Sequence, residues 1–143
     1  MGTCDEARWT KGERPGTSKC GDYHVADEVG LPPNEVEDAV EELLAELAAT
    51  MRESNADRNA LAMTAYAHAA LVDIHPFADG NGRVARLLMN YVLLYLSVPP
   101  ISVSADDRLA YFGALDAFHE SGDLESFKTL CRVQTLKTWN ELL

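Results

Sequence analysis

Proline residues divide the chain, from residue 31 onward, into segments that are each about as long as one helix. Pro32 and Pro33 precede the first segment, Pro76 ends the second, and Pro99 and Pro100 end the third. Proline lacks a backbone N–H and disfavours a helical conformation in the residue before it, so a regular helix does not continue through these positions. The chain is therefore predicted to form several separate helices.

Apolar residues recur at helical spacing inside each segment. This pattern predicts helices over about 34–54, 55–74, 82–96, 104–119 and 123–143. We expect Asn34 to cap the first helix and Ser104 to cap the fourth, because both side chains can accept a hydrogen bond from a first-turn N–H.

Burial can also be predicted from the apolar pattern. The second helix is rich in alanine and apolar nearly all round, and the stretch 87–96 is typical of a central core helix. The last helix is predicted to turn inward the residues Leu124, Phe127, Leu130, Cys131 and Leu136. A poorly ordered lead is expected over 1–20 and an extended, hairpin-like segment over 22–30.

The charge and the cysteines exclude several classes of protein. A formal net charge of −11 repels nucleic acid and anionic lipid, so a phosphate ligand would need a local cluster of donors. Three cysteines without paired spacing make neither a disulfide framework nor a zinc site. Because the longest apolar stretch is too short to cross a bilayer, we expect a cytoplasmic protein, and the alanine-rich composition favours a bacterial one.

The run HPFADGNGRVAR, at residues 75–86, lies between the second and third predicted helices. Gly80 and Gly82 allow backbone angles that converge successive N–H groups on an anion, and the helix that follows adds its own N-terminal donors. Arg83 and Arg86 are three residues apart, so both can face the same anion. No P-loop and no GxGxxG pattern is present. The run therefore predicts a distinct polyphosphate site.

Two further side chains in this run complete a possible reaction centre. Asp79 is a lone carboxylate next to the predicted phosphate site, which is the usual protein contribution to a magnesium ion. His75 ends the preceding helix, and a histidine with its reference pKa of about 6.5 is largely neutral at pH 7. We expect His75 to act as a general base on an incoming hydroxyl.

The same run matches HxFx(D/E)GNGRxxR, the signature of the Fic (Fido) domain family, at every specified position. The chain resembles this family of protein adenylyltransferases from about Gly21 to its end, which implies a Fic domain over 21–143. The fold implied is all-α, a Fic-type helical bundle with a short β-hairpin flap. The activity implied is AMPylation, the transfer of AMP from Mg-ATP to a Ser, Thr or Tyr hydroxyl of a target protein with release of pyrophosphate.

The resemblance also implies roles for individual residues of the signature. His75 would deprotonate the target hydroxyl, and Asp79 would hold Mg²⁺ between the α- and β-phosphates of ATP. Gly80, Asn81 and Gly82 would form the anion hole, with the Asn81 side chain on the α-phosphate. Arg83 would contact the β-phosphate and Arg86 the γ-phosphate.

Residues outside the signature are assigned with alternatives. The flap residues Val25, Ala26, Asp27, Glu28 and Val29 would pair in extended form with the target, although a plain surface hairpin is the other interpretation. Tyr111 and Phe112 are candidates for adenine contacts or for the core. His119 lies near a position where some relatives carry Asn, but a surface residue at a helix end is favoured, and His68 is expected to be a core histidine.

Regulation and partners remain open in the sequence. Many Fic proteins carry an inhibitory helix with the pattern (S/T)xxxE(G/N), and Ser121 alone has a Glu four residues later, with Ser126 where Gly or Asn belongs. We therefore expect either an active enzyme, an antitoxin-like inhibitory protein, or a helix from a removed N-terminal part. A homodimer is an open alternative to a monomer. The runner-up function is a Fic-type toxin module that uses another nucleotide or phosphoryl donor.

Overall fold

The computed structural model describes residues 30–142. This part contains five α-helices: α1 (Pro33–Met51), α2 (Ala60–Ile74), α3 (Asn81–Tyr95), α4 (Arg108–Ser121) and α5 (Glu125–Leu142). Two short 3₁₀ turns precede α2 and α4, at Ala56–Asn59 and Ala105–Asp107. The predicted all-α class is confirmed for these residues, whereas the predicted lead and flap lie outside them.

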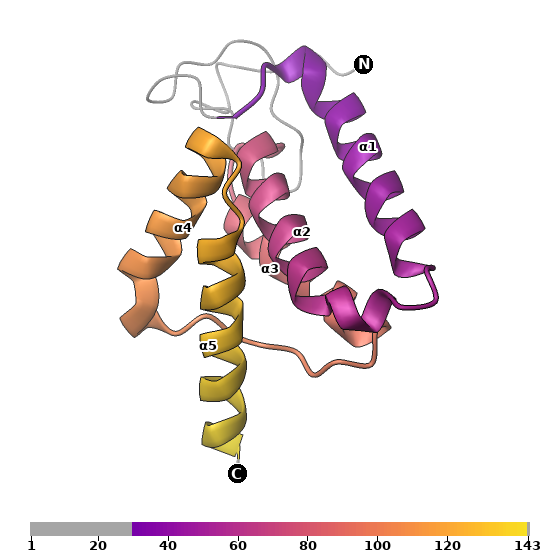
Figure 1. Ribbon diagram of the computed structural model, residues 1–143. Helices are drawn as coiled ribbons and strands as arrows, with labels where there is room; N and C mark the ends of the chain where they lie inside the picture. Colours follow the sequence, from indigo (N-terminus) through magenta and orange to yellow (C-terminus); the bar gives the residue numbers. More distant parts are fainter. Residues whose placement is uncertain (1–29, 143) are drawn as a thin grey trace.

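Helix α2 lies at the centre of the bundle and contacts α1, α3, α4 and α5 (Figure 1). Ten of its fifteen residues are buried, among them five alanines, Met63, Thr64, His68, Leu71 and Ile74. Small alanine side chains let neighbouring helices approach closely from every side, which is why this helix carries no polar face. The predicted burial of the second helix is confirmed.

The apolar core has two parts, which meet on α2 and α3. The first joins α1 to α2 and α3 and includes Val36, Leu43 and Leu47 from α1. The second joins α2 and α3 to α4 and α5 around Met89 and Phe127, neither of which is exposed at all. The two helices on either side of the signature loop are thus held from both sides.

Helix α3 is buried on one face only. Met89, Val92 and Leu93 are buried, but Leu87 is 68% exposed and Tyr91 60% exposed. The prediction of a central core helix over 87–96 is wrong for this second face, because α2 covers α3 from one side and no described helix covers the other.

Two helix starts differ in how their first N–H groups are satisfied. Ser104 accepts a hydrogen bond from the Asp106 N–H at 3.3 Å, which confirms the predicted cap. Asn34 is not a cap, because α1 begins one residue earlier at Pro33 and no side chain caps it. Proline suits the first helical position, since its fixed φ is already helical and it has no N–H to satisfy.

Helix α5 packs along α2 and α4 in its first half and extends beyond the other helices in its second half (Figure 1). Phe127, Leu130 and Cys131 are buried as predicted. The prediction that Leu136 faces inward is wrong, because this side chain is 63% exposed. The contacts of this part of α5 go to residues 102–107 through the polar side chains of Gln134, Lys137 and Thr138 and do not include Leu136.

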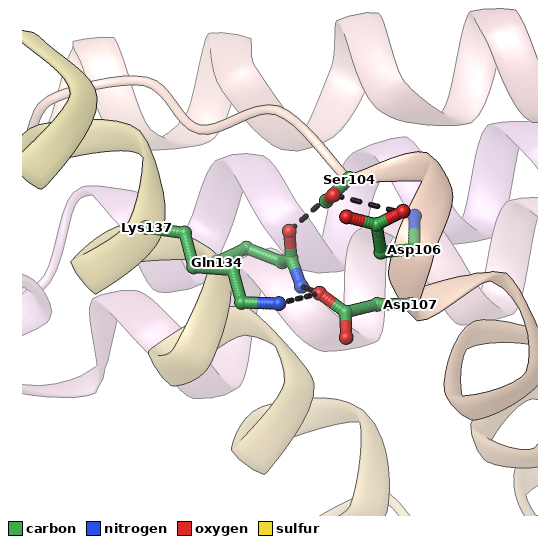
Figure 2. A network of polar contacts seen from close by, with 5 residues as sticks. All are labelled: Ser104, Asp106, Asp107, Gln134 and Lys137. Atoms are coloured by element: carbon green, nitrogen blue, oxygen red, sulfur yellow. Dashed lines mark hydrogen bonds and ion pairs between the residues drawn. The ribbon is translucent and has the colours of Figure 1, made fainter.

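A polar network joins α5 to the start of α4 (Figure 2). The buried Gln134 amide accepts from the Ser104 N–H at 2.8 Å and donates to Asp107 Oδ2 at 2.7 Å. Lys137 forms an ion pair with the same carboxylate. Hydrogen bonds from Lys137 first and Gln134 second hold the pKa of Asp107 below its ordinary value. The network fixes α4, which carries Tyr111, relative to α5.

Candidate active site

His75 follows the last residue of α2 and has a left-handed backbone, with φ 53° and ψ 59°. Its N–H still donates to the Leu71 carbonyl at 3.0 Å, so it closes the helix before the chain turns away. Pro76 explains the ending, because a residue before proline is disfavoured in the right-handed helical region. A non-glycine residue in the left-handed region costs about 1–2 kcal/mol, a strain that is often found at functional sites.

The segment before α1 passes directly over this histidine. Leu31 donates its N–H to the Ile74 carbonyl at 3.1 Å, and Gly30 has φ +80°. A Cβ at Gly30 would lie 2.4 Å from the His75 Cβ and 2.5 Å from the Ile74 carbonyl oxygen. Only glycine fits this close approach. The residue that follows the predicted flap in sequence is therefore in contact with the candidate base.

The signature loop is closed by the side chain of Asn81. Its Oδ1 accepts from the Phe77 N–H at 2.8 Å, and its Nδ2 donates to the Phe77 carbonyl at 2.7 Å. The residue is only 5% exposed. Because the amide nitrogen carries two N–H bonds, one of them remains for a ligand while the other holds the loop. Asn81 therefore shapes the loop in addition to any contact with phosphate.

The first turn of α3 offers several unpaired donors. Gly80 precedes the helix in a left-handed conformation, with φ 84°, and supplies no capping side chain. The first intrahelical bond, from the Val84 N–H to the Gly80 carbonyl, is 3.0 Å long. The N–H groups of the three preceding residues, Asn81, Gly82 and Arg83, therefore lie before the helical ladder and point out of the helix end. This arrangement can bind an anion.

Asp79 is exposed beside these donors, and its Oδ1 accepts the Gly80 N–H at 2.8 Å. This bond orients the carboxylate toward the start of the helix and leaves Oδ2 for another ligand. The Gly80 N–H, which the sequence assigned to the anion hole, is engaged by the carboxylate in this structure.

The two signature arginines differ in their surroundings. Arg83 is exposed, whereas Arg86 is partly buried and folds back over Gly82. A Cβ at Gly82 would lie 3.3 Å from Arg86 Nη1 and 3.8 Å from Tyr111 Oη, so the guanidinium occupies the space that a side chain would fill. Both cations belong to the first turns of α3, as their spacing predicts, and Arg86 is held against that turn.

A sequence profile of the Fic/DOC family matches residues 10–93. The chain belongs to the Fic/DOC family. Among curated relatives, the protein adenylyltransferase Fic of Drosophila persimilis is 45% identical over 74 residues, which cover 52% of this chain and 14% of that protein. The Fic protein of Aedes aegypti is 46% identical over 63 residues, covering 44% of this chain and 12% of that protein. That of Drosophila virilis is 43% identical over 74 residues, covering 52% and 15%.

The chain thus aligns with only a small part of these Fic proteins, 12% to 15% of their length. All three relatives come from insects, so they do not support the bacterial origin expected from composition. Within residues 30–142, no helix combines the length and the apolar character that crossing a membrane requires.

The predicted magnesium site depends on which acidic side chains lie near the phosphate site. Among the described residues, no three His, Cys, Asp or Glu side chains gather into a metal-binding group. Magnesium takes few ligands from protein and most from water and phosphate oxygens, so a single carboxylate beside a phosphate site suits it. The free Oδ2 of Asp79 fits that requirement.

Tyr111 and Phe112, the two aromatic residues predicted near adenine, differ in solvent exposure. Tyr111 is buried, and its hydroxyl lies 2.7 Å from His68 Nε2. Phe112 is 47% exposed and packs edge-on against Tyr111, with the Arg108 guanidinium carbon 5.5 Å from its ring centre. Only Phe112 presents an exposed ring to a base, and the adenine contact stays a prediction for both.

The remaining histidines are placed as the sequence favoured. His68 is fully buried in the core, where desolvation lowers its pKa to about 4. His119 is an exposed residue near the end of α4, and its Nδ1 pairs with Asp73 Oδ1 near the end of α2. Asp73 raises the pKa of His119, mainly through this hydrogen bond. Sequence reasoning missed the His68–Tyr111 contact, because the two residues are 43 positions apart.

Proposed function

We propose that this chain transfers AMP from Mg-ATP to a hydroxyl side chain of a target protein and releases pyrophosphate. The observation that supports the proposal is the first turn of α3, where the first N–H groups precede the helical ladder, Asp79 accepts the Gly80 N–H and Arg86 lies over Gly82. The similar insect proteins are named protein adenylyltransferases, which supports the same chemistry.

The reaction assigns one proton transfer to His75. Its imidazole takes the proton of the target hydroxyl, and the oxygen then attacks the α-phosphorus of ATP. The new O–P bond forms as the bond between the α-phosphorus and the bridging oxygen breaks, and pyrophosphate leaves with the electron pair. The protonated imidazole afterwards loses its proton to solvent.

The α3 end supplies the electrostatic part of the reaction. The helix N–H groups of Gly82 and Arg83 bind phosphate oxygens, and the Arg83 and Arg86 side chains neutralise the departing pyrophosphate. Asp79 Oδ2 would hold Mg²⁺, which supplies further positive charge at the phosphates when bound. The Asn81–Phe77 hydrogen bonds keep the loop in shape during these changes.

The target would be aligned by the segment ahead of α1. Gly30 touches His75, and the predicted flap residues 25–29 come immediately before it in sequence. Backbone pairing between that segment and an extended target peptide would bring a hydroxyl toward the imidazole. An antitoxin-like inhibitor, a homodimer and a cytoplasmic location remain predictions from the sequence.

A labelling experiment tests the proposal against the phosphotransferase alternative. The chain is incubated with cell lysate and ATP radiolabelled at either the α- or the γ-phosphorus. Label from the α-position alone, lost in His75→Ala, is the expected result. Label from the γ-position alone would show phosphate transfer and contradict the proposal, as would undiminished labelling by His75→Ala.

A further inference from the structure

A buried pair of side chains lies directly behind Arg86. His68 of α2 and Tyr111 of α4 are hydrogen-bonded through Nε2 and Oη at 2.7 Å, and both are buried. The Arg86 guanidinium also lies near the Tyr111 hydroxyl, since both approach the same point beside Gly82: a Cβ there would lie 3.3 Å from Arg86 Nη1 and 3.8 Å from Tyr111 Oη. The two core residues therefore link the middle of the bundle to one of the signature arginines.

A guanidinium only donates, so the Tyr111 oxygen is the atom that can accept from Arg86. A neutral His68 can then accept the Tyr111 hydroxyl proton at Nε2, with its own ring proton on the buried Nδ1. Burial, with a smaller contribution from Arg86, lowers the pKa of His68 to about 4, so the ring is neutral at physiological pH.

Neighbouring rings prevent this pair from moving. The Phe127 ring of α5 stacks on the His68 ring, with 4.9 Å between the ring centroids and an interplanar angle of 28°. The Tyr111 ring meets the His68 ring edge-on at 5.4 Å. Since Phe127 and His68 have no exposed surface, neither ring has space to rotate away. The Tyr111 oxygen is thus a fixed acceptor, held by α2, α4 and α5.

Gly82 limits the space around the guanidinium as well. A Cβ there would lie 3.3 Å from Arg86 Nη1, so the guanidinium lies close to the helix backbone. A flexible arginine would lose rotamer freedom on binding a phosphate, whereas one held in advance loses less. Arg86 lies next to both Tyr111 and Gly82, at the first turns of α3.

We propose that Tyr111 and His68 are positioning residues, which hold the Arg86 guanidinium ready for the terminal phosphate of the nucleotide. The inference rests on the proposed function for its ligand, a nucleoside triphosphate. It gives Tyr111 a role other than an adenine contact. The pair should raise the binding affinity for ATP, which has the terminal phosphate, and should change the affinity for ADP, which lacks it, very little.

The test measures equilibrium binding of ATP and ADP, with magnesium, by calorimetry. Tyr111→Phe removes only the hydroxyl, and His68→Phe removes the acceptor but keeps a ring against Phe127. Tyr111→Phe should weaken ATP binding about tenfold, the size expected for losing one charge-assisted hydrogen bond, whereas His68→Phe loses a neutral hydrogen bond and should weaken it by a smaller factor. Both should leave ADP binding within about twofold. His68→Gln keeps an acceptor and should retain most of the affinity for ATP.

Tyr66→Phe is the matched control, because Tyr66 donates to Glu46 at 2.7 Å on the far side of α2 and should change neither affinity. Equal losses for ATP and ADP in Tyr111→Phe would show a general structural role and overturn the inference, as would no loss at all. If His68→Phe does not fold, Tyr111→Phe and His68→Gln still decide between these outcomes.

A ligand-free measurement separates the inference from the proposed function. In NMR spectra of the side-chain N–H groups of arginine, Arg86 should give a sharp signal with slow solvent exchange, lost in Tyr111→Phe. If the wild-type chain binds neither nucleotide but shows this signal, the proposed function fails while the positioning of Arg86 stands. A rapidly exchanging Arg86 signal in the wild type would overturn the positioning itself.

Discussion

The backbone N–H of Leu31 donates to the carbonyl oxygen of Ile74 at 3.1 Å. This one bond joins the segment before α1 to the last residue of α2, next to the close approach of Gly30 to His75. The candidate base is therefore covered by a backbone segment that comes from far away in sequence. The geometry of His75 depends on that contact as well as on the signature loop.

Gly30→Ala should lower both stability and AMP transfer. The new Cβ would overlap the His75 side chain and force an alanine into a left-handed conformation, at a cost of at least about 2 kcal/mol. Urea denaturation measures the loss. Gly113→Ala is the control, because its Cβ would meet nothing within 4 Å and alanine favours a helix by up to about 1 kcal/mol. Equal stabilities for the two variants would contradict the close approach at Gly30.

Asn81→Ala should open the signature loop. It removes both hydrogen bonds to the Phe77 backbone and should reduce the free energy of unfolding by about 1–3 kcal/mol. Transfer activity should fall further than stability explains, because the loop donors lose their alignment. Asn59→Ala is the comparison, since its side chain makes no capping bond, and it should change stability by less than about 0.5 kcal/mol.

His119 should titrate above its ordinary pKa of 6.5, because Asp73 favours the protonated ring. A raised pKa in the folded state means that the ion pair stabilises the fold fully below pH 6.5, and that this contribution is lost as the pH rises through the folded pKa. NMR titration should show the midpoint returning toward 6.5 in Asp73→Asn. An unchanged midpoint would refute the pairing.

Gln134→Leu should loosen the contact between α4 and α5. The buried amide satisfies the Ser104 N–H and contacts the Asp107 carboxylate, so its removal should reduce the free energy of unfolding by about 1–3 kcal/mol (Figure 2). Chemical denaturation of this variant is compared with that of Asn140→Leu, which changes an exposed residue of the same helix. The prediction fails if both variants are equally stable.

Local patterns in the sequence predicted the helices well, because proline and apolar spacing act within a few residues. Pro76 ends α2 at Ile74. Ser104 caps the 3₁₀ turn that precedes α4. The signature run likewise predicted an anion site at the start of a helix, and α3 does start there, at Asn81. These features need no knowledge of distant contacts.

Apart from the Asn34 cap, the errors concern burial, which distant contacts decide. Leu136 follows the apolar period of α5, yet this side chain is 63% exposed. Tyr91 and Leu87 belong to an apolar run, yet only one face of α3 meets the described bundle. The arrangement of Arg86, Tyr111 and His68 was likewise invisible, since it joins three helices through side chains that no local spacing relates.

The left-handed backbone of His75 lowers the stability of the fold at the residue that is proposed to act as the base. Glycine and asparagine tolerate that conformation better than histidine does. A search for more stable variants would therefore select against histidine at position 75. A thermostable relative that lacks this histidine should be assayed for loss of AMP transfer.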